Sequence, residues 1–245
     1  MQEIPVHHLV FFDKLAEIYP LRVDLVYAQP EHRENHFGGI YDPSARMGGH
    51  RDLAAVICLA SIHLRAQYGW TLVIKDCLRT IEAQEKMTHT DIVRANPHWL
   101  VEPRFLSSAG QGGHPRGMAI DVGVIDDQER DINFGTPFDY FSSSADARAN
   151  KAHRQYDGHS DAIKQNRLIL ENTIKSAGKI LGNEILPLPH EWWDFRFLSS
   201  YSNQFKPLAD ADLPDGYWMT KPNEKHANCD ESLGYIADKI KSQLI

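Results

Sequence analysis

The stretch from Met118 to Val124 constrains the fold most, because two kinds of residue alternate along it. Its apolar positions are Met118, Ile120, Val122 and Val124. Between them stand residues that are small or acidic, namely Ala119, Asp121 and Gly123. Successive side chains of a β-strand point to opposite faces, so the pattern predicts a strand with one face in the core. The other face carries a carboxylate that has space in front of it.

Helical periodicity is present on both sides of this strand. Apolar residues recur at three- and four-residue steps over Asp52–Gln67, which predicts a helix that ends at Gly69. The apolar run Thr71–Lys75 then predicts a short buried strand. Similar spacing predicts helices over Ile81–Val93 and Ala162–Ala177, the second followed by a glycine that suits a helix end. Mixed elements of this kind predict the α+β class.

The remaining segments complete an outline of a single domain with an appendage. Ser142–Asp161 is polar and has no period, which predicts a surface loop. Glu191–Phe197 is dense in aromatic residues, which favours a strand, and a bulge is then needed if Glu191 and Asp194 serve one site. We expect a catalytic domain over residues 1–206, and residues 207–245 to form a linker and an amphipathic C-terminal helix.

Composition and charge exclude several classes of function. The formal net charge is -7 and no long basic run is present, so we expect no nucleic-acid partner. No apolar stretch is long enough to cross a membrane and no signal peptide is evident, so we expect a cytoplasmic protein without a membrane partner. Cys58, Cys77 and Cys229 are odd in number and form no CxxC pair, which favours reduced, structural thiols. The oligomeric state is left open.

The strongest local motif lies just before the alternating strand. Glycines flank His114, and Asp121 follows it in the strand itself. Glycines leave room for an imidazole to reach an ion, and the carboxylate adds a hard oxygen, so the pair predicts two ligands of a metal site. For an isolated pair, a turn histidine and a solvated or capping aspartate is the commoner explanation.

A second motif is Glu191-Trp192-Trp193-Asp194. Tryptophans beside a glutamate partly desolvate the carboxyl group and raise its pKa toward working pH, which suits a residue that transfers protons. A core strand with an exposed glutamate explains the same letters equally well.

Together the two motifs resemble the D-alanyl-D-alanine dipeptidases, the zinc enzymes of vancomycin-resistance and D-alanine-recycling systems. The first family motif reads S-x-H-x-x-G-x-A-x-D, and the chain departs from it only at Gly112. The second reads E-W-W-H, and here its last position is Asp194. Weaker matches follow in the family's order at Val23–Ala28, Asn35–Gly38, Asp76–Thr80, Gly135–Asp139, Asn166-Arg167 and Ala177-Gly178. The resemblance covers roughly residues 5 to 206.

For the fold and the metal, the resemblance implies a single α+β domain in which helices flank a small, mainly antiparallel sheet, as in the D,D-peptidase or hedgehog-like fold. It implies one Zn²⁺ per chain, with His114 and Asp121 as ligands and Asp194 in the third ligand position. Because Asp194 replaces an imidazole by a carboxylate, a harder ion such as Mn²⁺ could compete with zinc. On this view Asp194→His raises zinc affinity, and His190 stays outside the ligand set.

For the chemistry, the resemblance implies hydrolysis of a small D-amino-acid dipeptide. Glu191 would act as general base and then as general acid, and Arg79 would face the carbonyl oxygen that becomes an oxyanion. Tyr27 and Asp139 would meet the free ammonium group of the dipeptide. Taken one by one, the last three also fit a surface ion pair, a core tyrosine and a turn residue.

Two other functions remain open at this stage. One is a relative without activity that binds a D-alanyl or peptidoglycan fragment, and Gly112 and Asp194 motivate it. The other is a hydrolase that acts on a different cell-wall peptide, which the altered residues after Arg79 and before His114 motivate. Metal content and release of free D-alanine would distinguish the three.

Overall fold

A five-stranded sheet forms the centre of the computed structural model, which describes residues 1–245 except 103, 145, 147, 226 and 245. Its strands, in spatial order, are β2 (Leu21–Val23), β4 (Thr71–Asp76), β5 (Ala119–Ile125), β7 (Asp194–Phe197) and β6 (Ile185–Pro187). β2 runs parallel to β4, and every other neighbouring pair is antiparallel. A separate antiparallel ribbon pairs β1 (Leu9–Phe11) with β3 (Gly48–His50). The prediction of a small, mainly antiparallel sheet in an α+β fold is confirmed.

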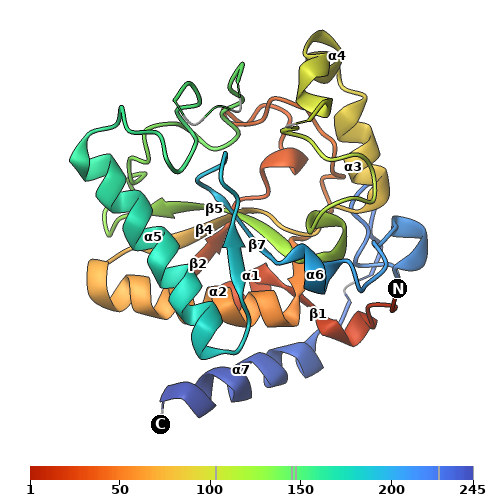
Figure 1. Cartoon of the computed structure of the whole chain (residues 1–245). Coiled ribbons are helices and arrows are strands. Elements are labelled where there is room, and N and C mark those ends of the chain that lie inside the picture. The colour runs from red at the N-terminus through yellow and green to blue at the C-terminus, as the bar shows by residue number, and fades with distance from the viewer. Residues whose placement is uncertain (103, 145, 147, 226, 245) are drawn as a thin grey trace.

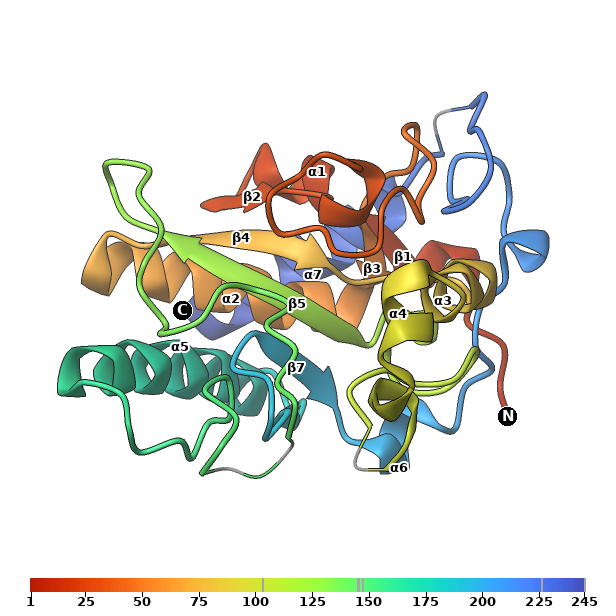
Figure 2. The same ribbon diagram turned by 90° about the horizontal axis from the view of Figure 1, so that it is seen from above.

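Helices cover one face of this sheet and loops cover the other. The α-helices are α1 (Phe12–Ala16), α2 (Arg51–Tyr68), α3 (Ile81–Thr88), α4 (Asp91–Ala95), α5 (Asp161–Ile180), α6 (Ser199–Ser202) and α7 (Asp230–Leu244). Short 3-10 turns are η1 (Val6–His8), η2 (Val26–Ala28), η3 (Pro97–Leu100), η4 (His114–Arg116) and η5 (Asp210–Asp212). α2 and α5 pack side by side beneath the sheet, and α7 lies outside α2 (Figures 1 and 2). The opposite face is left to loops and to α3 and α4.

The helix predicted over Asp52–Gln67 and the strands predicted over Thr71–Lys75 and Met118–Val124 are confirmed within one or two residues. Gly69 ends α2 as expected, with a left-handed φ of 70°. The alternating strand is β5, whose apolar side chains are buried in the core. The residues between them are buried as well, so both faces of β5 are covered, and the face that carries Asp121 lines a cavity.

The prediction of one helix over Ile81–Val93 is wrong, because the helix is interrupted between α3 and α4. Thr90 turns back and its hydroxyl donates to the carbonyl of Met87 at 2.9 Å, which ends the first helix. Asp91 then places a carboxylate in the first turn of the next helix, where the helix dipole favours negative charge.

Gly178 does not end its helix, since α5 continues to Ile180. A side chain at Gly178 would meet the carbonyl oxygen of Asn183 at 2.5 Å and the side chain of Ile185 at 2.7 Å. The glycine therefore allows the chain to fold back closely onto the helix on its way into β6.

The strand predicted over Glu191–Phe197 is shorter than expected, because β7 begins only at Asp194. Glu191 lies in the turn that joins β6 to β7, and the amide of Leu188 donates to the carbonyl of Asp194 at 3.0 Å to close this turn. The predicted bulge is therefore not needed. Because Glu191 lies outside the strand, its side chain can point to the same side as that of Asp194 without one.

The C-terminal segment ends in the predicted helix, which packs along α2. Asp52 at the start of α2 accepts hydrogen bonds from Tyr235 at 2.6 Å and from Lys239 at 2.7 Å. The hydroxyl of Ser232 donates to the carbonyl of His7 at 2.6 Å. Ile236 and Ile240 are buried, as the apolar spacing predicts.

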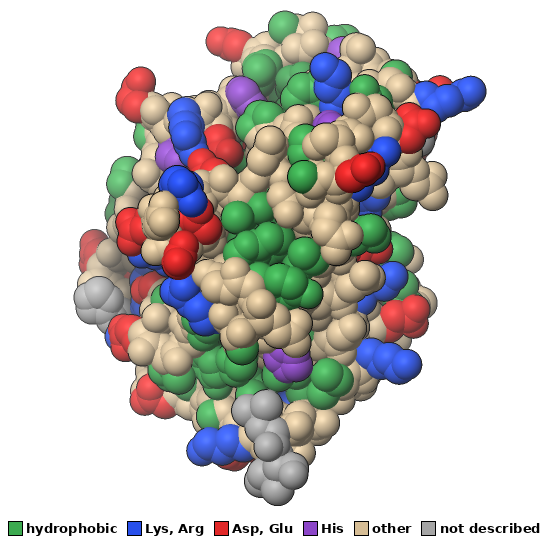
Figure 3. All heavy atoms as spheres, turned by 90° about the vertical axis from the view of Figure 1, so that its left-hand side faces the viewer, with side chains coloured by type: hydrophobic (Ala, Val, Ile, Leu, Met, Phe, Trp, Pro, Cys, Tyr) green, Lys and Arg blue, Asp and Glu red, His purple; other side chains and the backbone are tan. Residues whose placement is uncertain are grey.

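Three further observations concern the whole chain. Cys58, Cys77 and Cys229 are buried free thiols, in agreement with the prediction. Among the described residues, no helix combines the length and the apolar character that a membrane crossing requires. On the face shown in Figure 3, acidic and basic side chains are interspersed around a patch of apolar atoms.

Candidate metal centre and active site

Three aspartates form a row across neighbouring strands at one end of the sheet. Asp121 on β5 pairs with Asp76 on β4 and with Asp194 on β7. The register between β4 and β5 shifts after Ile74, so that two residues of β4 oppose one of β5. Such a bulge re-aims the side chains that follow it, and here it brings Asp76 level with Asp121. All three carboxylates are buried.

His114 reaches this row because glycines let its loop approach the sheet. A Cβ on Gly113 would lie 2.8 Å from the Cβ of Ala119, and a Cβ on Gly117 would lie 2.8 Å from the amide nitrogen of His50. Gly117 also has a left-handed φ of 60°, which most residues avoid. The glycines thus allow two backbone segments to approach closely, which brings His114 to the aspartates.

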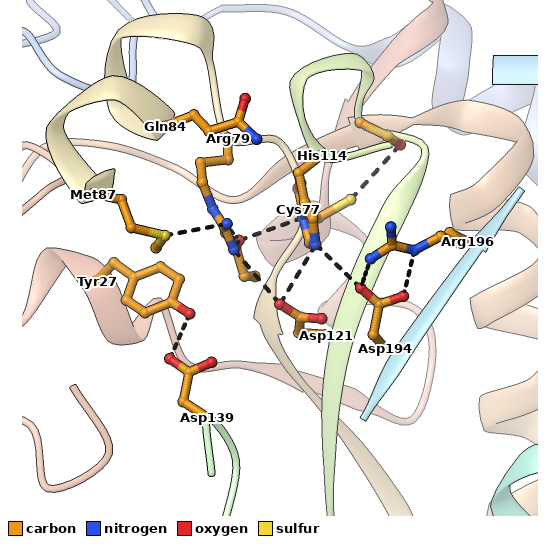
Figure 4. Close-up of polar contacts among 12 residues, drawn as sticks. Tyr27, Cys77, Arg79, Gln84, Met87, His114, Asp121, Asp139, Asp194 and Arg196 are labelled. Atoms are coloured by element: carbon orange, nitrogen blue, oxygen red, sulfur yellow. Dashed lines mark hydrogen bonds and ion pairs between the residues drawn. The ribbon is translucent and has the colours of Figure 1, made fainter. Parts of the chain in front are cut away.

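The imidazole of His114 presents Nε2 to the carboxylates. Its Nδ1 lies 2.8 Å from the carbonyl oxygen of Cys77, and since a carbonyl only accepts, Nδ1 carries the proton. Nε2 is then a lone-pair donor, 3.6 Å from Oδ2 of Asp121 and 3.5 Å from Oδ2 of Asp194 (Figure 4). The three side chains belong to segments that are distant in sequence.

The donor atoms fit a metal ion. Bonds of about 2.1 Å in a tetrahedral site put neighbouring ligand atoms about 3.4 Å apart, close to both separations measured from Nε2. Oδ1 of Asp121 is buried and has no hydrogen-bond partner among the described residues. A buried carboxylate oxygen without a donor is costly unless a cation satisfies it. Burial, together with the charges of Asp194 and Asp76, raises the pKa of Asp121 well above its usual value.

Asp76 also lies near enough to be considered as a ligand. Side-chain donor atoms of Asp76, His114 and Asp121 lie within 4.8 Å of one another. However, Asp76 faces the protonated Nδ1 of His114, at 3.4 Å, and accepts from Tyr41 at 2.6 Å and from Nε of Arg79 at 2.9 Å. Because Asp76 faces the protonated nitrogen of His114 and not its lone pair, these contacts favour a role in holding Arg79.

Asp194 is held by an arginine that the sequence analysis did not single out. Nε of Arg196 donates to Oδ1 of Asp194 at 2.7 Å, and Nη2 of Arg196 donates to Oδ2. Burial alone would raise the pKa of Asp194, but the Arg196 guanidinium and His114 hold it well below its usual range. The sequence did contain a signal for this contact. Arg196 stands two residues after Asp194, so on a strand both side chains point to the same face.

Arg79 lies over the same row from the β4 side. Its Nη2 is 3.7 Å from Oδ2 of Asp121, and its guanidinium carbon is 5.3 Å from the ring centre of Tyr27. Burial of the side chain alone would lower the pKa of Arg79, but Asp76 and the other acidic groups nearby more than offset this, so Arg79 stays charged. Arg79 thus brings a fixed cation close to the candidate metal ligands.

Glu191 lines the cavity in front of His114 and Asp194. Burial and the negative charge of Asp194 raise the pKa of Glu191 to about 8. Trp193 is fully buried beside it and lines the same cavity, in line with the predicted desolvation by tryptophan. A carboxyl group with a pKa near neutrality can both accept and release a proton.

Tyr27 and Asp139 form a pair on the opposite wall. The hydroxyl of Tyr27 donates to Oδ2 of Asp139 at 2.6 Å. Burial raises the pKa of Asp139 to about 7, although this hydrogen bond and Arg79 oppose the shift. Trp192 ties the loop of Asp139 to the turn of Glu191, since its Nε1 donates to the hydroxyl of Thr136 at 2.9 Å.

The cavity between these groups is small and partly closed by aromatic side chains. Its volume is about 40 Å³, and its wall includes all the predicted site residues, namely Tyr27, Arg79, His114, Asp121, Asp139, Glu191 and Asp194. Phe105 and Phe141 also line it, and Phe141 stacks on Trp99 at 4.3 Å. The sequence analysis missed this wall, because isolated aromatic residues in loops carry no distinguishing pattern.

Gly112, where the motif has a serine, also lines the cavity. Its φ of 83° favours glycine, and Oγ of Ser107 lies 3.4 Å from the place a Cβ would take. Ser107 belongs to the cavity wall and was not predicted.

Comparison with known proteins agrees with this arrangement. The model of the D-ala-D-ala dipeptidase family matches residues 8–208. The D-alanyl-D-alanine dipeptidase of Escherichia coli (strain K12) is 30% identical over 198 residues, which cover 80% of this chain and 88% of that protein. The matched region contains every residue that lines the cavity. The chain is therefore a member of the D-ala-D-ala dipeptidase family of peptidases.

Proposed function

We propose that this protein hydrolyses a D-alanyl-D-alanine-type dipeptide to free D-alanine with the help of one metal ion per chain. The observation that carries the proposal is the position of His114 Nε2, at 3.6 Å from Asp121 and 3.5 Å from Asp194, next to a buried carboxylate oxygen without a donor. His114, Asp121 and Asp194 would hold the ion. When bound, it would polarise the scissile carbonyl and acidify a water molecule.

Glu191 is the proton carrier in this proposal. It would take a proton from the attacking water and deliver it to the departing amine, as general base and then as general acid. The raised pKa of about 8 supports both directions of transfer near neutral pH. Asp139, with a pKa of about 7, also lies outside the aspartate row, but it accepts a hydrogen bond from Tyr27, which leaves Glu191 as the proposed proton carrier.

Arg79 would stabilise the negative charge that grows on the carbonyl oxygen. It lies 3.7 Å from Asp121 and is fixed by its bonds to Asp76, so it need not reorganise during the reaction. A preorganised cation of this kind acts mainly on the transition state.

Tyr27 and Asp139 would receive the ammonium group of the substrate. An ammonium ion favours the ionised form of Asp139, whose pKa lies at about 7 without it. The small cavity and its wall of Phe105 and Phe141 favour a short substrate over a long peptide.

Zinc is the ion we propose first, because a nitrogen donor with carboxylates in a tetrahedral set suits it. The second carboxylate, Asp194, makes the set harder than one with two imidazoles, so Mn²⁺ is the competing ion. Metal analysis of the purified protein would identify the ion.

One experiment separates this proposal from the two other functions. Purified protein is incubated with D-Ala-D-Ala, L-Ala-L-Ala and D-Ala-ended tripeptides, with Zn²⁺ or Mn²⁺ present, and free D-alanine is measured. We expect release from the D,D-dipeptide, and no release after His114→Ala. Metal binding without any hydrolysis would favour a binding protein, and cleavage of the longer peptides alone would favour a different cell-wall substrate.

A further inference from the structure

The pair formed by Asp194 and Arg196 replaces the one imidazole that the family motif has and this chain lacks. The two residues lie two positions apart on β7 and therefore on the same face of the strand. Their contact is bidentate, with Nε on one carboxylate oxygen and Nη2 on the other. Only 1% of the Asp194 side chain and 19% of the Arg196 side chain are exposed.

We propose that Arg196 is a positioning residue for the metal centre, and that Asp194 and Arg196 together act as one neutral unit in place of the neutral imidazole. The inference rests on the proposed function, because it concerns the metal ion that His114, Asp121 and Asp194 would hold. It adds that Arg196 sets the charge and the orientation of this third ligand.

The first argument is charge. A divalent ion with two imidazoles and one carboxylate retains one unit of positive charge, and a second carboxylate cancels it. Arg196 adds that unit back within contact distance of the carboxylate that removed it. The site thus retains the net positive charge that a Lewis acid needs, although its ligand set carries one more carboxylate.

The second argument is orientation. A carboxylate on a strand can rotate about its own axis, but the planar fork of Arg196 fixes both oxygens at once. In the fixed position, Oδ2 lies 3.5 Å from Nε2 of His114. The backbone of Asp194 is fixed as well, since its carbonyl accepts from Nη2 of the partly buried Arg154 at 2.8 Å.

Zinc affinity of the metal-free protein, measured by titration against a chromophoric chelator, tests the charge argument. Asp194→His leaves the Arg196 guanidinium buried beside a dication without its partner, so we expect binding at least about tenfold weaker than in the wild type. Adding Arg196→Gln should restore affinity to within a few fold of the wild type. The exposed Arg130 pairs with Asp126 away from the cavity, so Asp194→His with Arg130→Gln is the matched control and should restore nothing.

Arg196→Lys tests the orientation argument, because lysine retains the charge and loses the fork. We expect zinc affinity close to that of the wild type but a shifted absorption spectrum of the Co²⁺-substituted protein. An unchanged spectrum would contradict the orientation role.

If Asp194→His fails to fold, Arg196→Gln alone should bind zinc several-fold more tightly, because a buried cation is removed.

The proposal is overturned if Asp194→His binds zinc as tightly as the wild type, or if Arg196→Gln brings no recovery. Failure of the proposed function has a different signature. In that case the wild type binds zinc no better than His114→Ala, whatever residue stands at position 196.

Discussion

Asp121 and Asp194 lie directly opposite each other on the paired strands β5 and β7, in the register where cross-strand side chains are neighbours. Like charges at such positions oppose strand pairing. Here each aspartate has its own cation, Arg79 near Asp121 and Arg196 on Asp194, and His114 lies between the two carboxylates. We expect an ion held by both carboxylates to offset their repulsion further.

Metal removal should therefore destabilise the protein. We expect a chelator to lower the melting temperature, and saturating Zn²⁺ to stabilise the fold by about 4 kcal/mol when the ion is present at about a thousand times its dissociation constant. Calorimetry at several zinc concentrations measures this. His114→Ala should melt at the same temperature with and without zinc, and a zinc-dependent rise in that variant would place the ion elsewhere.

Glu191→Gln should lower kcat by about 100-fold or more while zinc remains bound, because proton transfer is lost and no ligand is removed. Turnover of D-Ala-D-Ala and metal content of the same preparation are the measurements. Glu184→Gln is the matched control, since Glu184 is exposed near β6 and should change neither value. Near-normal turnover of the first variant would remove Glu191 from the mechanism.

Arg79→Ala should lower kcat by about 100-fold to 1000-fold with a smaller change in KM, because the charge that Arg79 meets develops mainly in the transition state. The variant also leaves buried Asp76 without its ion-pair partner, which should reduce stability by about 3 kcal/mol or more. Steady-state kinetics and a melting curve separate the two effects. A change in KM alone would make Arg79 a ground-state anchor for the substrate.

Asp139 should make the stability of the metal-free protein depend on pH. Its pKa is raised by burial from 3.8 to about 7, so the unfolded chain loses this proton at lower pH than the folded protein does. The contribution to stability is complete below the unfolded pKa and is lost as pH rises through the folded pKa, by at most about 4 kcal/mol.

Asp139→Asn should remove this dependence, and asparagine also tolerates the left-handed φ of 55° at that position. Urea unfolding of both proteins at several pH values between 4 and 8 gives the difference in free energy. A difference that does not change with pH would show that Asp139 is ionised throughout. The variant should also raise KM, because the proposed partner of the substrate ammonium loses its charge.

The sequence by itself determined the elements whose patterns follow from burial. The alternation in β5 and the helical spacing in α2 and α5 predict these elements, because their apolar side chains recur at the period of the element and pack in the core. The motif around His114 and Asp121 could be recognised for a similar reason, since its glycines are required where the local backbone leaves no room for a side chain. The roles assigned to the site residues remain predictions until the variants are measured.

Only the tertiary structure decided how these residues meet. The row of Asp76, Asp121 and Asp194 depends on the register of three strands and on a bulge in β4, and strand register is set by pairing between distant segments. From the sequence alone, Asp194 was predicted to be a metal ligand whose replacement by histidine would raise zinc affinity. Its pairing with Arg196 alters that expectation, because a side chain's charge acts through its contacts, and those form only when the strand closes the sheet.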